Sequence, residues 1–89
     1  MMGITNKVLN ENGQQSEALA SWENIARNIL VREMKKQKIG YKQLSRQLES
    51  MGIFESPDRI NRKINRKRFS AAFFLACCRA MGITSLVLW

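Results

Sequence analysis

The ten residues 59–68, RINRKINRKR, constrain the fold of this chain more than any other segment. They contain six arginines or lysines, no acidic residue and two isoleucines four positions apart. In a helix, Ile60 and Ile64 lie about 40° apart and form one narrow apolar seam. Arg59, Arg62 and Arg66 then fall on the side away from that seam. The segment is therefore predicted to be a helix that buries one edge and presents guanidinium groups outward, a shape suited to a DNA groove.

Length and charge point to one small basic domain. The chain has 89 residues, of which 45% are hydrophobic, and its formal net charge is +8. Residues 1–20 hold one lysine and two glutamates, whereas residues 21–89 hold 14 basic and five acidic residues. This imbalance favours a polyanionic partner, with nucleic acid first and an anionic membrane surface second. The alternative is that the charge only maintains solubility.

The hydrophobic pattern divides the chain into a short arm and a helical domain. Residues 1–20 are polar and lack sustained periodicity, which predicts a flexible N-terminal arm. Residues 21–89 are expected to form an all-α, four-helix domain that ends in an extended tail. Apolar residues at 3–4 spacing, from Trp22 to Met34, predict that one stripe of the first helix is buried. The expected helices run from Ser21 to a stop at Gly40, then over residues 41–51, 57–67 and 71–81, with the tail over residues 83–89.

Capping residues mark where these helices begin. Ser21, Ser56 and Ser70 are good N-caps, and Pro57 suits the first helical position. Between the second and third helices, Ile53 and Phe54 are expected to plug the core. The last stretch, ITSLVLW, is β-branched and apolar, which favours a strand or an extended tail.

The residue types offer no catalytic or metal site. The chain has no histidine, and Cys77 and Cys78 are adjacent, so they are expected to be small buried thiols rather than a disulfide or a zinc site. No glycine-rich phosphate loop or carboxylate pair is evident. We therefore expect no enzyme activity, no cofactor and no metal. No long apolar stretch predicts a signal peptide or a membrane span, so a cytoplasmic, nucleoid-associated protein is expected.

The second helix, the turn and the basic helix form a helix-turn-helix pattern. Guanine edges suit a bidentate arginine, adenine edges suit asparagine, and phosphates suit any positioned cation. We expect the arginines of the third helix, with Asn61 and Asn65, to face the bases, while Lys63, Lys67 and Arg68 contact phosphates. At the second helix, Tyr41 is expected to contact a phosphate, or else to cap or pack. The predicted DNA-binding residues are Arg59, Asn61, Arg62, Lys63, Asn65, Arg66, Lys67, Arg68, Tyr41 and Lys42.

The fourth helix, AAFFLACC at its start, is apolar on nearly every face. One stripe, including Phe73 and Cys77, is expected to face the core, which leaves a second stripe for another surface. A domain this small has difficulty burying both stripes, so a homodimer is predicted. The alternative is that the tail of the same chain covers the second stripe. The predicted dimer interface consists of Phe74, Cys78, Met81, Leu86 and Leu88.

The segments LVREMKKQKIGYKQLSRQL, INRKINRKRFS and FLACCRAMGI, between Ile25 and Leu86, resemble the lambda-repressor-like (Xre/Cro-type) helix-turn-helix class. The chain is also similar, over about residues 22–86, to a small bacterial family of uncharacterised helix-turn-helix-like domains, with FSAAFF as the most specific element. The turn MGIFESP is longer than in the lambda class, and Lys67 stands where a glycine is usual. The resemblance implies DNA binding, while the small family implies no particular function.

Together these features predict a sequence-specific regulator that binds double-stranded DNA as a homodimeric repressor of bacterial or phage type. Its expected action is occlusion of a promoter. One alternative is a protein-interaction module, such as an adaptor or antirepressor, whose basic helix binds an acidic protein. RNA is a third possibility, against which the lack of aromatic platforms counts.

Overall fold

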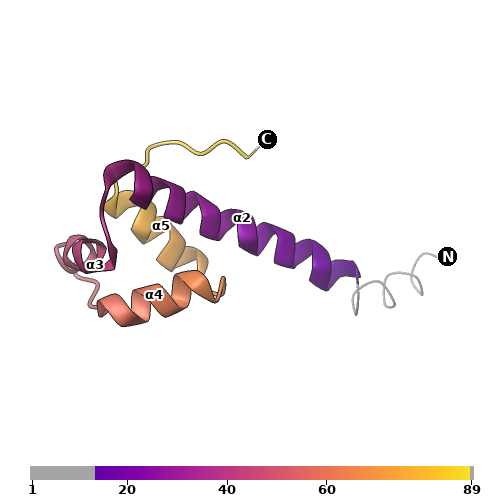
Figure 1. Cartoon of the computed structure of the whole chain (residues 1–89), viewed down its shortest axis with the longest axis horizontal. Coiled ribbons are helices and arrows are strands. Elements are labelled where there is room, and N and C mark those ends of the chain that lie inside the picture. Colours follow the sequence, from indigo (N-terminus) through magenta and orange to yellow (C-terminus); the bar gives the residue numbers. More distant parts are fainter. Residues whose placement is uncertain (1–13, 89) are drawn as a thin grey trace.

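The computed structural model describes residues 14–88 and forms four helices in that range (Figure 1). They are α2 (Gln14–Gln37), α3 (Tyr41–Glu49), α4 (Pro57–Asn65) and α5 (Ala71–Ala80). No strand occurs among these residues, and residues 83–88 run as an extended tail. The all-α, four-helix prediction is therefore confirmed. The first 13 residues of the predicted arm, and Trp89, lie outside the described range.

The first helix begins earlier than expected. Helix α2 starts at Gln14, so residues 14–20 are helical and Ser21 lies inside the helix rather than capping it. The segment QQSEALA is rich in good helix formers, and Glu17 in the first turn favours the positive end of the helix dipole. The early start carries the helix past the bundle, and Trp22, expected in the core, is 53% exposed (Figure 1).

Capping was predicted correctly for the two later helices. The Ser56 hydroxyl accepts a hydrogen bond from the Arg59 amide at 3.2 Å, and Pro57 occupies the first helical position. The Ser70 hydroxyl accepts from the Phe73 amide at 3.0 Å. These caps satisfy amide donors that each helix leaves free at its start. They explain how α4 begins cleanly despite its concentrated positive charge.

The core forms where all four helices meet, and each helix contributes apolar residues at helical spacing. Leu44 and Leu48 of α3 and Ile60 and Ile64 of α4 are fully buried, as the periodicity predicts. The complete buried set is Leu30, Met34, Leu44, Leu48, Ile60, Ile64, Phe73, Cys77, Cys78 and Met81. Several partly buried residues, including Ile53, pack against it.

Phe54 does not plug the core, contrary to expectation, and is 77% exposed. The chain leaves α3 through Gly52, whose φ of 85° lies in the left-handed region that glycine adopts without strain. The Ile53 amide then donates to the Leu48 carbonyl at 3.0 Å, which holds Ile53 against the core. Along the extended segment that follows, side chains alternate in direction, so Phe54 points to solvent.

The predicted dimer stripe on α5 is wrong for two of its residues, because Cys78 and Met81 are buried in the monomer. The C-terminal end of α2 covers this side of α5, where the Gln37 amide donates to the Met81 carbonyl at 2.6 Å. The tail leaves over the same region, and the Ile83 amide donates to the Cys78 carbonyl. Phe74 is half-buried and stacks on Phe69 with a centroid separation of 6.2 Å. Among the predicted interface residues, only Leu86 and Leu88 are exposed.

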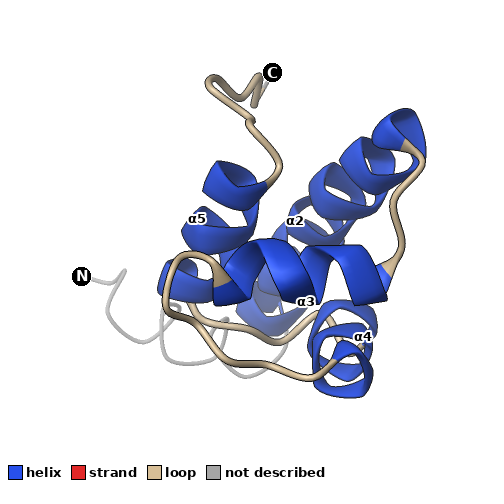
Figure 2. Ribbon diagram, turned by 90° about the vertical axis from the view of Figure 1, so that its left-hand side faces the viewer, coloured by secondary structure: helices blue, strands red, loops and turns tan. Residues whose placement is uncertain are grey.

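Helices α3 and α4 cross steeply. In Figure 1, α3 is seen end-on and α4 is seen lengthwise. In Figure 2, after a quarter turn, α3 is seen lengthwise and α4 is seen end-on. The loop of residues 50–56 joins them, and the Ser45 hydroxyl of α3 anchors this loop by donating to the Glu55 carbonyl at 2.6 Å. This arrangement leaves the outer side of α4 uncovered, which positions the candidate site.

Candidate nucleic-acid interface

The basic side chains of α4 gather on one face, beside the loop that follows the helix. Arg59, Arg62, Lys63, Arg66 and Arg68 line a shallow depression of about 400 Å³. The isoleucine seam lies on the other side of the helix and is fully buried. The predicted division of α4 into an apolar edge and an outward guanidinium face is thus present in the structure.

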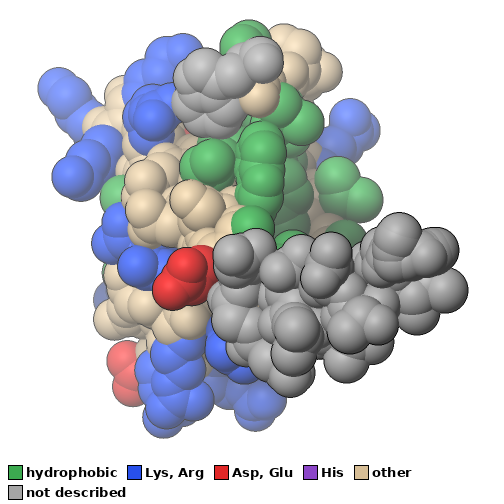
Figure 3. All heavy atoms as spheres, turned by 90° about the vertical axis from the view of Figure 1, so that its right-hand side faces the viewer, with side chains coloured by type: hydrophobic (Ala, Val, Ile, Leu, Met, Phe, Trp, Pro, Cys, Tyr) green, Lys and Arg blue, Asp and Glu red, His purple; other side chains and the backbone are tan. Residues whose placement is uncertain are grey.

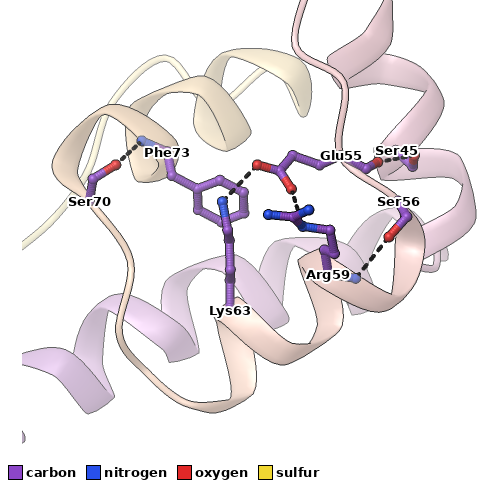
Figure 4. A network of polar contacts seen from close by, with 7 residues as sticks. All are labelled: Ser45, Glu55, Ser56, Arg59, Lys63, Ser70 and Phe73. Carbon is purple, nitrogen blue, oxygen red and sulfur yellow. Dashed lines mark hydrogen bonds and ion pairs between the residues drawn. The ribbon is translucent and has the colours of Figure 1, made fainter.

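Glu55 organises one edge of this face, and the sequence analysis missed it. Its carboxylate lies 2.7 Å from the Lys63 ammonium and 3.4 Å from the Arg59 Nε (Figure 4). The hydrogen bond from Lys63 lowers the pKa of Glu55, although partial burial of the carboxyl opposes this effect. The spacing of four residues between Glu55 and Arg59 was the sequence signal that could have indicated this ion pair. However, Glu55 lies before α4, so the direction of its side chain depends on the conformation of the loop.

Lys63, predicted to contact a phosphate, is thus paired with another residue of the same protein. Besides Glu55, its ammonium lies over the Phe73 ring, 4.9 Å from the centroid (Figure 4). A cation in this position is attracted by the electron-rich ring face. The side chain is 35% exposed, so the Glu55 pair is open to solvent on one side. Lys63 links α4 to α5 and to the preceding loop.

Asn65 joins three helices through its side-chain amide. Its Nδ2 donates to the Tyr41 hydroxyl and to the Asn61 carbonyl, each at 3.0 Å, and also to Asn61 Oδ1. Its Oδ1 accepts from Arg27 of α2 at 3.1 Å. The amide that the sequence analysis assigned to an adenine is thus exposed but already hydrogen-bonded to other residues of the protein. Arg27 was not predicted here, since its position in α2 gives no indication of this contact.

Tyr41 and Lys42 lie in the first turn of α3. Tyr41 is half-buried with its hydroxyl on Asn65, and Lys42 is exposed. No side-chain hydrogen bond caps this helix at Gly40. Tyr41 packs against the core, and its contact with a phosphate stays a prediction.

Arg62 of α4 and Arg66, the C-cap residue of this helix, are the arginines that point freely outward. Within residues 14–88, the side-chain ion pairs and hydrogen bonds of basic residues involve Arg27, Arg59 and Lys63, and none involves Arg62 or Arg66. Both arginines are exposed. Their guanidinium groups therefore remain available for an external acceptor.

Lys67 and Arg68 form the exposed turn after α4. Lys67 has a φ of 60°, in the left-handed region that costs a residue with a side chain about 1 kcal/mol or more. This is the position where the resemblance predicts a glycine. A lysine at this strained position places a cation beside Arg66 and Arg68 at the edge of the basic face.

Two other kinds of site are absent from the described part of the chain. Residues 14–88 contain no group of three metal-ligating side chains, and no helix among them is long and apolar enough to cross a membrane. Cys77 and Cys78 are free and buried, as predicted. Burial raises the pKa of Cys77 to about 12, which disfavours the reactive thiolate.

The fold and site define an all-α, four-helix domain with one arginine-rich helix exposed on its surface. The chain belongs to the family described as Domain of unknown function (DUF6471), whose model matches residues 22–86. A search of curated proteins and a search of solved structures each found no match.

Proposed function

We propose that this domain binds double-stranded DNA by inserting α4 into the major groove, in the manner of a lambda-repressor-like helix-turn-helix protein. The observation that carries the proposal is the free guanidinium pair, Arg62 and Arg66, on a helix whose opposite edge is fully buried. A rigidly seated helix that offers arginines outward meets the main requirement for direct readout of guanine edges.

The relation between α3 and α4 supports this assignment. The two helices cross steeply (Figure 2). They are fixed to each other by the buried side chains of Leu44, Leu48, Ile60 and Ile64. In helix-turn-helix proteins the second helix of such a pair lies in the groove, while the first crosses the backbone. The connecting loop of residues 50–56 is longer than a tight turn, but the Ser45–Glu55 hydrogen bond fixes its end.

The contacts within the protein refine the roles of the basic residues. Arg62 and Arg66 are assigned to base edges, and Lys67 and Arg68 to phosphates. Arg59 and Lys63 share the Glu55 carboxylate, so they contribute less net charge to a polyanion. Asn65, with Tyr41 and Arg27, is assigned to holding α4 against α2 and α3 rather than to reading adenine.

The biological role that follows is transcriptional regulation, with repression by occlusion as its simplest form. A protein that occupies the groove of a promoter excludes other proteins from the same surface without any catalytic step. Association with the nucleoid in the cytoplasm would accompany this role.

The salt dependence of DNA binding tests the proposal. The six cations of residues 59–68, less the charge of Glu55, correspond to about five phosphates, so log K should fall with log salt at a slope of roughly −4.5. Fluorescence anisotropy with a labelled duplex gives this slope directly. Glu55→Gln should release one more cation and steepen the slope by roughly 0.9.

A competing acidic protein provides the necessary contrast. Gel shifts on duplex DNA, with and without an excess of an acidic protein, distinguish a DNA-binding domain from a module that binds acidic proteins. A nearly flat salt response, or complete displacement by the acidic protein, would reject DNA as the main partner.

A further inference from the structure

The first half of α2 carries an apolar side that nothing among the described residues covers. Leu19 and Trp22 are each 53% exposed, although they lie on a helix that continues into the core at Leu30. In the tail, Val87 is 81% exposed, with Leu86 and Leu88 beside it. Figure 3, viewed toward the N-terminal end of α2, shows hydrophobic side chains gathered in one column with Lys and Arg groups on both sides. Contiguous exposed apolar surface of this kind marks an interaction site.

A groove lies between the second half of α2 and the tail. It measures about 200 Å³, somewhat more than the roughly 150 Å³ that suffices for a benzene ring. Its lining is Ile29, Arg32, Glu33, Ile83, Ser85, Leu86 and Val87. The groove therefore has room for an aromatic ring, with apolar side chains from both α2 and the tail to contact it beside the polar groups of Arg32, Glu33 and Ser85.

The distribution of charge along α2 indicates which molecule covers this apolar side and fills the groove. Residues 14–25 contain Glu17 and Glu23 and no basic residue, whereas residues 26–37 contain four basic residues and one acidic residue. Two copies of this helix placed antiparallel bring each acidic half against the other's basic half, and they also oppose the two helix dipoles favourably. A parallel arrangement would place like charges together. The complementarity is thus with a second copy of the same chain.

We propose that two copies of this protein associate through antiparallel α2 helices, with Trp22 of each copy seated in the groove between α2 and the tail of the other. A two-fold axis at the midpoint of α2, between Ile25 and Ala26, places Trp22 of one copy opposite Ile29 of the second copy. Such an isologous interface uses the same patch twice and closes at two subunits. It shares the tail with the interface expected from the sequence but uses α2 in place of α5, because Cys78 and Met81 of the expected α5 stripe are buried within the monomer.

This interface leaves the basic face free. In Figure 1 the tail lies on one side of α2, and α4 lies on the opposite side of the molecule. A dimer formed along α2 and the tail therefore does not cover Arg62 or Arg66. Dimer formation is proposed for the protein without DNA, so a test of the dimer does not depend on whether the protein binds DNA.

Sedimentation equilibrium of the full-length protein, without DNA, tests the dimer. The wild-type protein should sediment as a dimer at micromolar concentration. Trp22→Glu should weaken the dimer at least about 30-fold, because it removes a central aromatic anchor and buries a charge without a partner. Phe54→Glu is the matched control, since it places the same charge on another exposed aromatic position, outside the proposed interface, and should leave the dimer intact.

Charge reversal provides an independent second test. Glu23→Lys reverses a charge of the acidic half of α2 one turn after Leu19, on the same side of the helix, and should weaken the dimer, with a smaller effect at high salt. Circular dichroism establishes that each variant is folded, and Trp22→Ala replaces Trp22→Glu if the latter does not fold. A monomeric wild-type protein would overturn the proposal and indicate that another segment or partner covers the apolar side. A dimer unaffected by both substitutions would overturn it equally.

Discussion

The ammonium of Lys63 lies 2.7 Å from the carboxylate of Glu55, so a residue of the loop before α4 binds a cation in the last turn of that helix. The Glu55 side chain is only 17% exposed, and its second oxygen faces Arg59. This contact divides the basic face into an edge that stabilises the fold and a centre, Arg62 and Arg66, that remains available to a ligand.

The Glu55 pair should make stability depend on pH. Its pKa is lowered below the usual 4.5 in the folded protein, so its stabilising contribution is present above that value and is lost as the pH falls through the folded pKa. The free energy of unfolding, measured by urea denaturation from pH 7 to pH 3, should fall more in the wild-type protein than in Glu55→Gln. Parallel curves for the two proteins would show that the pair contributes nothing.

Substitution of Arg62 should reduce sequence discrimination. Arg62→Ala should cost roughly 1–3 kcal/mol on a preferred duplex and relax the preference at one base step. Lys67→Ala, which removes a cation from the edge, should weaken all duplexes about equally. Selection from a random duplex library, followed by anisotropy on matched and mismatched duplexes, measures both effects. Equal losses on every duplex for both variants would contradict the division of roles.

Two lysines at left-handed positions allow stability and DNA binding to be separated. Lys67 and Lys38 have positive φ angles of 60° and 59°, which strain a residue that carries a side chain. Lys67→Gly and Lys38→Gly remove this strain, and each should stabilise the protein by roughly 1 kcal/mol. Both variants lose one positive charge, but only Lys67 borders the basic face. Urea denaturation should therefore show two similar gains, while anisotropy should show weaker DNA binding for Lys67→Gly alone. Equal DNA affinities would remove Lys67 from the interface.

The Asn65–Tyr41 hydrogen bond should couple α3 to α4. A double-mutant cycle of Tyr41→Phe and Asn65→Ala, followed by urea denaturation, should give a coupling energy of about 0.5 kcal/mol, at the low end for a hydrogen bond because the contact is exposed. The affinity of both single variants for DNA should decrease less than that of Arg62→Ala. A large, base-specific loss for Asn65→Ala would restore it as a base-reading residue.

If both proposals hold, the preferred DNA site should be an inverted repeat. An isologous dimer presents two copies of α4 related by a two-fold axis, and such pairs contact half-sites separated by roughly 34 Å or a multiple of it. Footprinting of a selected site would reveal two symmetric protected regions. In Trp22→Glu, half-sites should be bound singly and without cooperativity.

Much of the local structure follows from the sequence because its causes are local. The isoleucine seam of α4, the leucines of α3 and the caps Ser56 and Ser70 depend on residues within one or two turns. The outward direction of Arg62 and Arg66 follows from the same periodicity. For these features, spacing along the chain is equivalent to position in space.

The tertiary structure decided which of the remaining faces are covered. Cys78 and Met81 look available on α5 alone, yet the end of α2, more than forty residues away, buries them. Asn65 resembles a base-reading residue on α4 alone, yet Arg27 and Tyr41 engage it from two other helices. Periodicity identifies the faces of one helix, but it contains no information about which neighbour lies against each face. That choice depends on how the four helices pack to bury their combined apolar surface, and only the folded chain shows it.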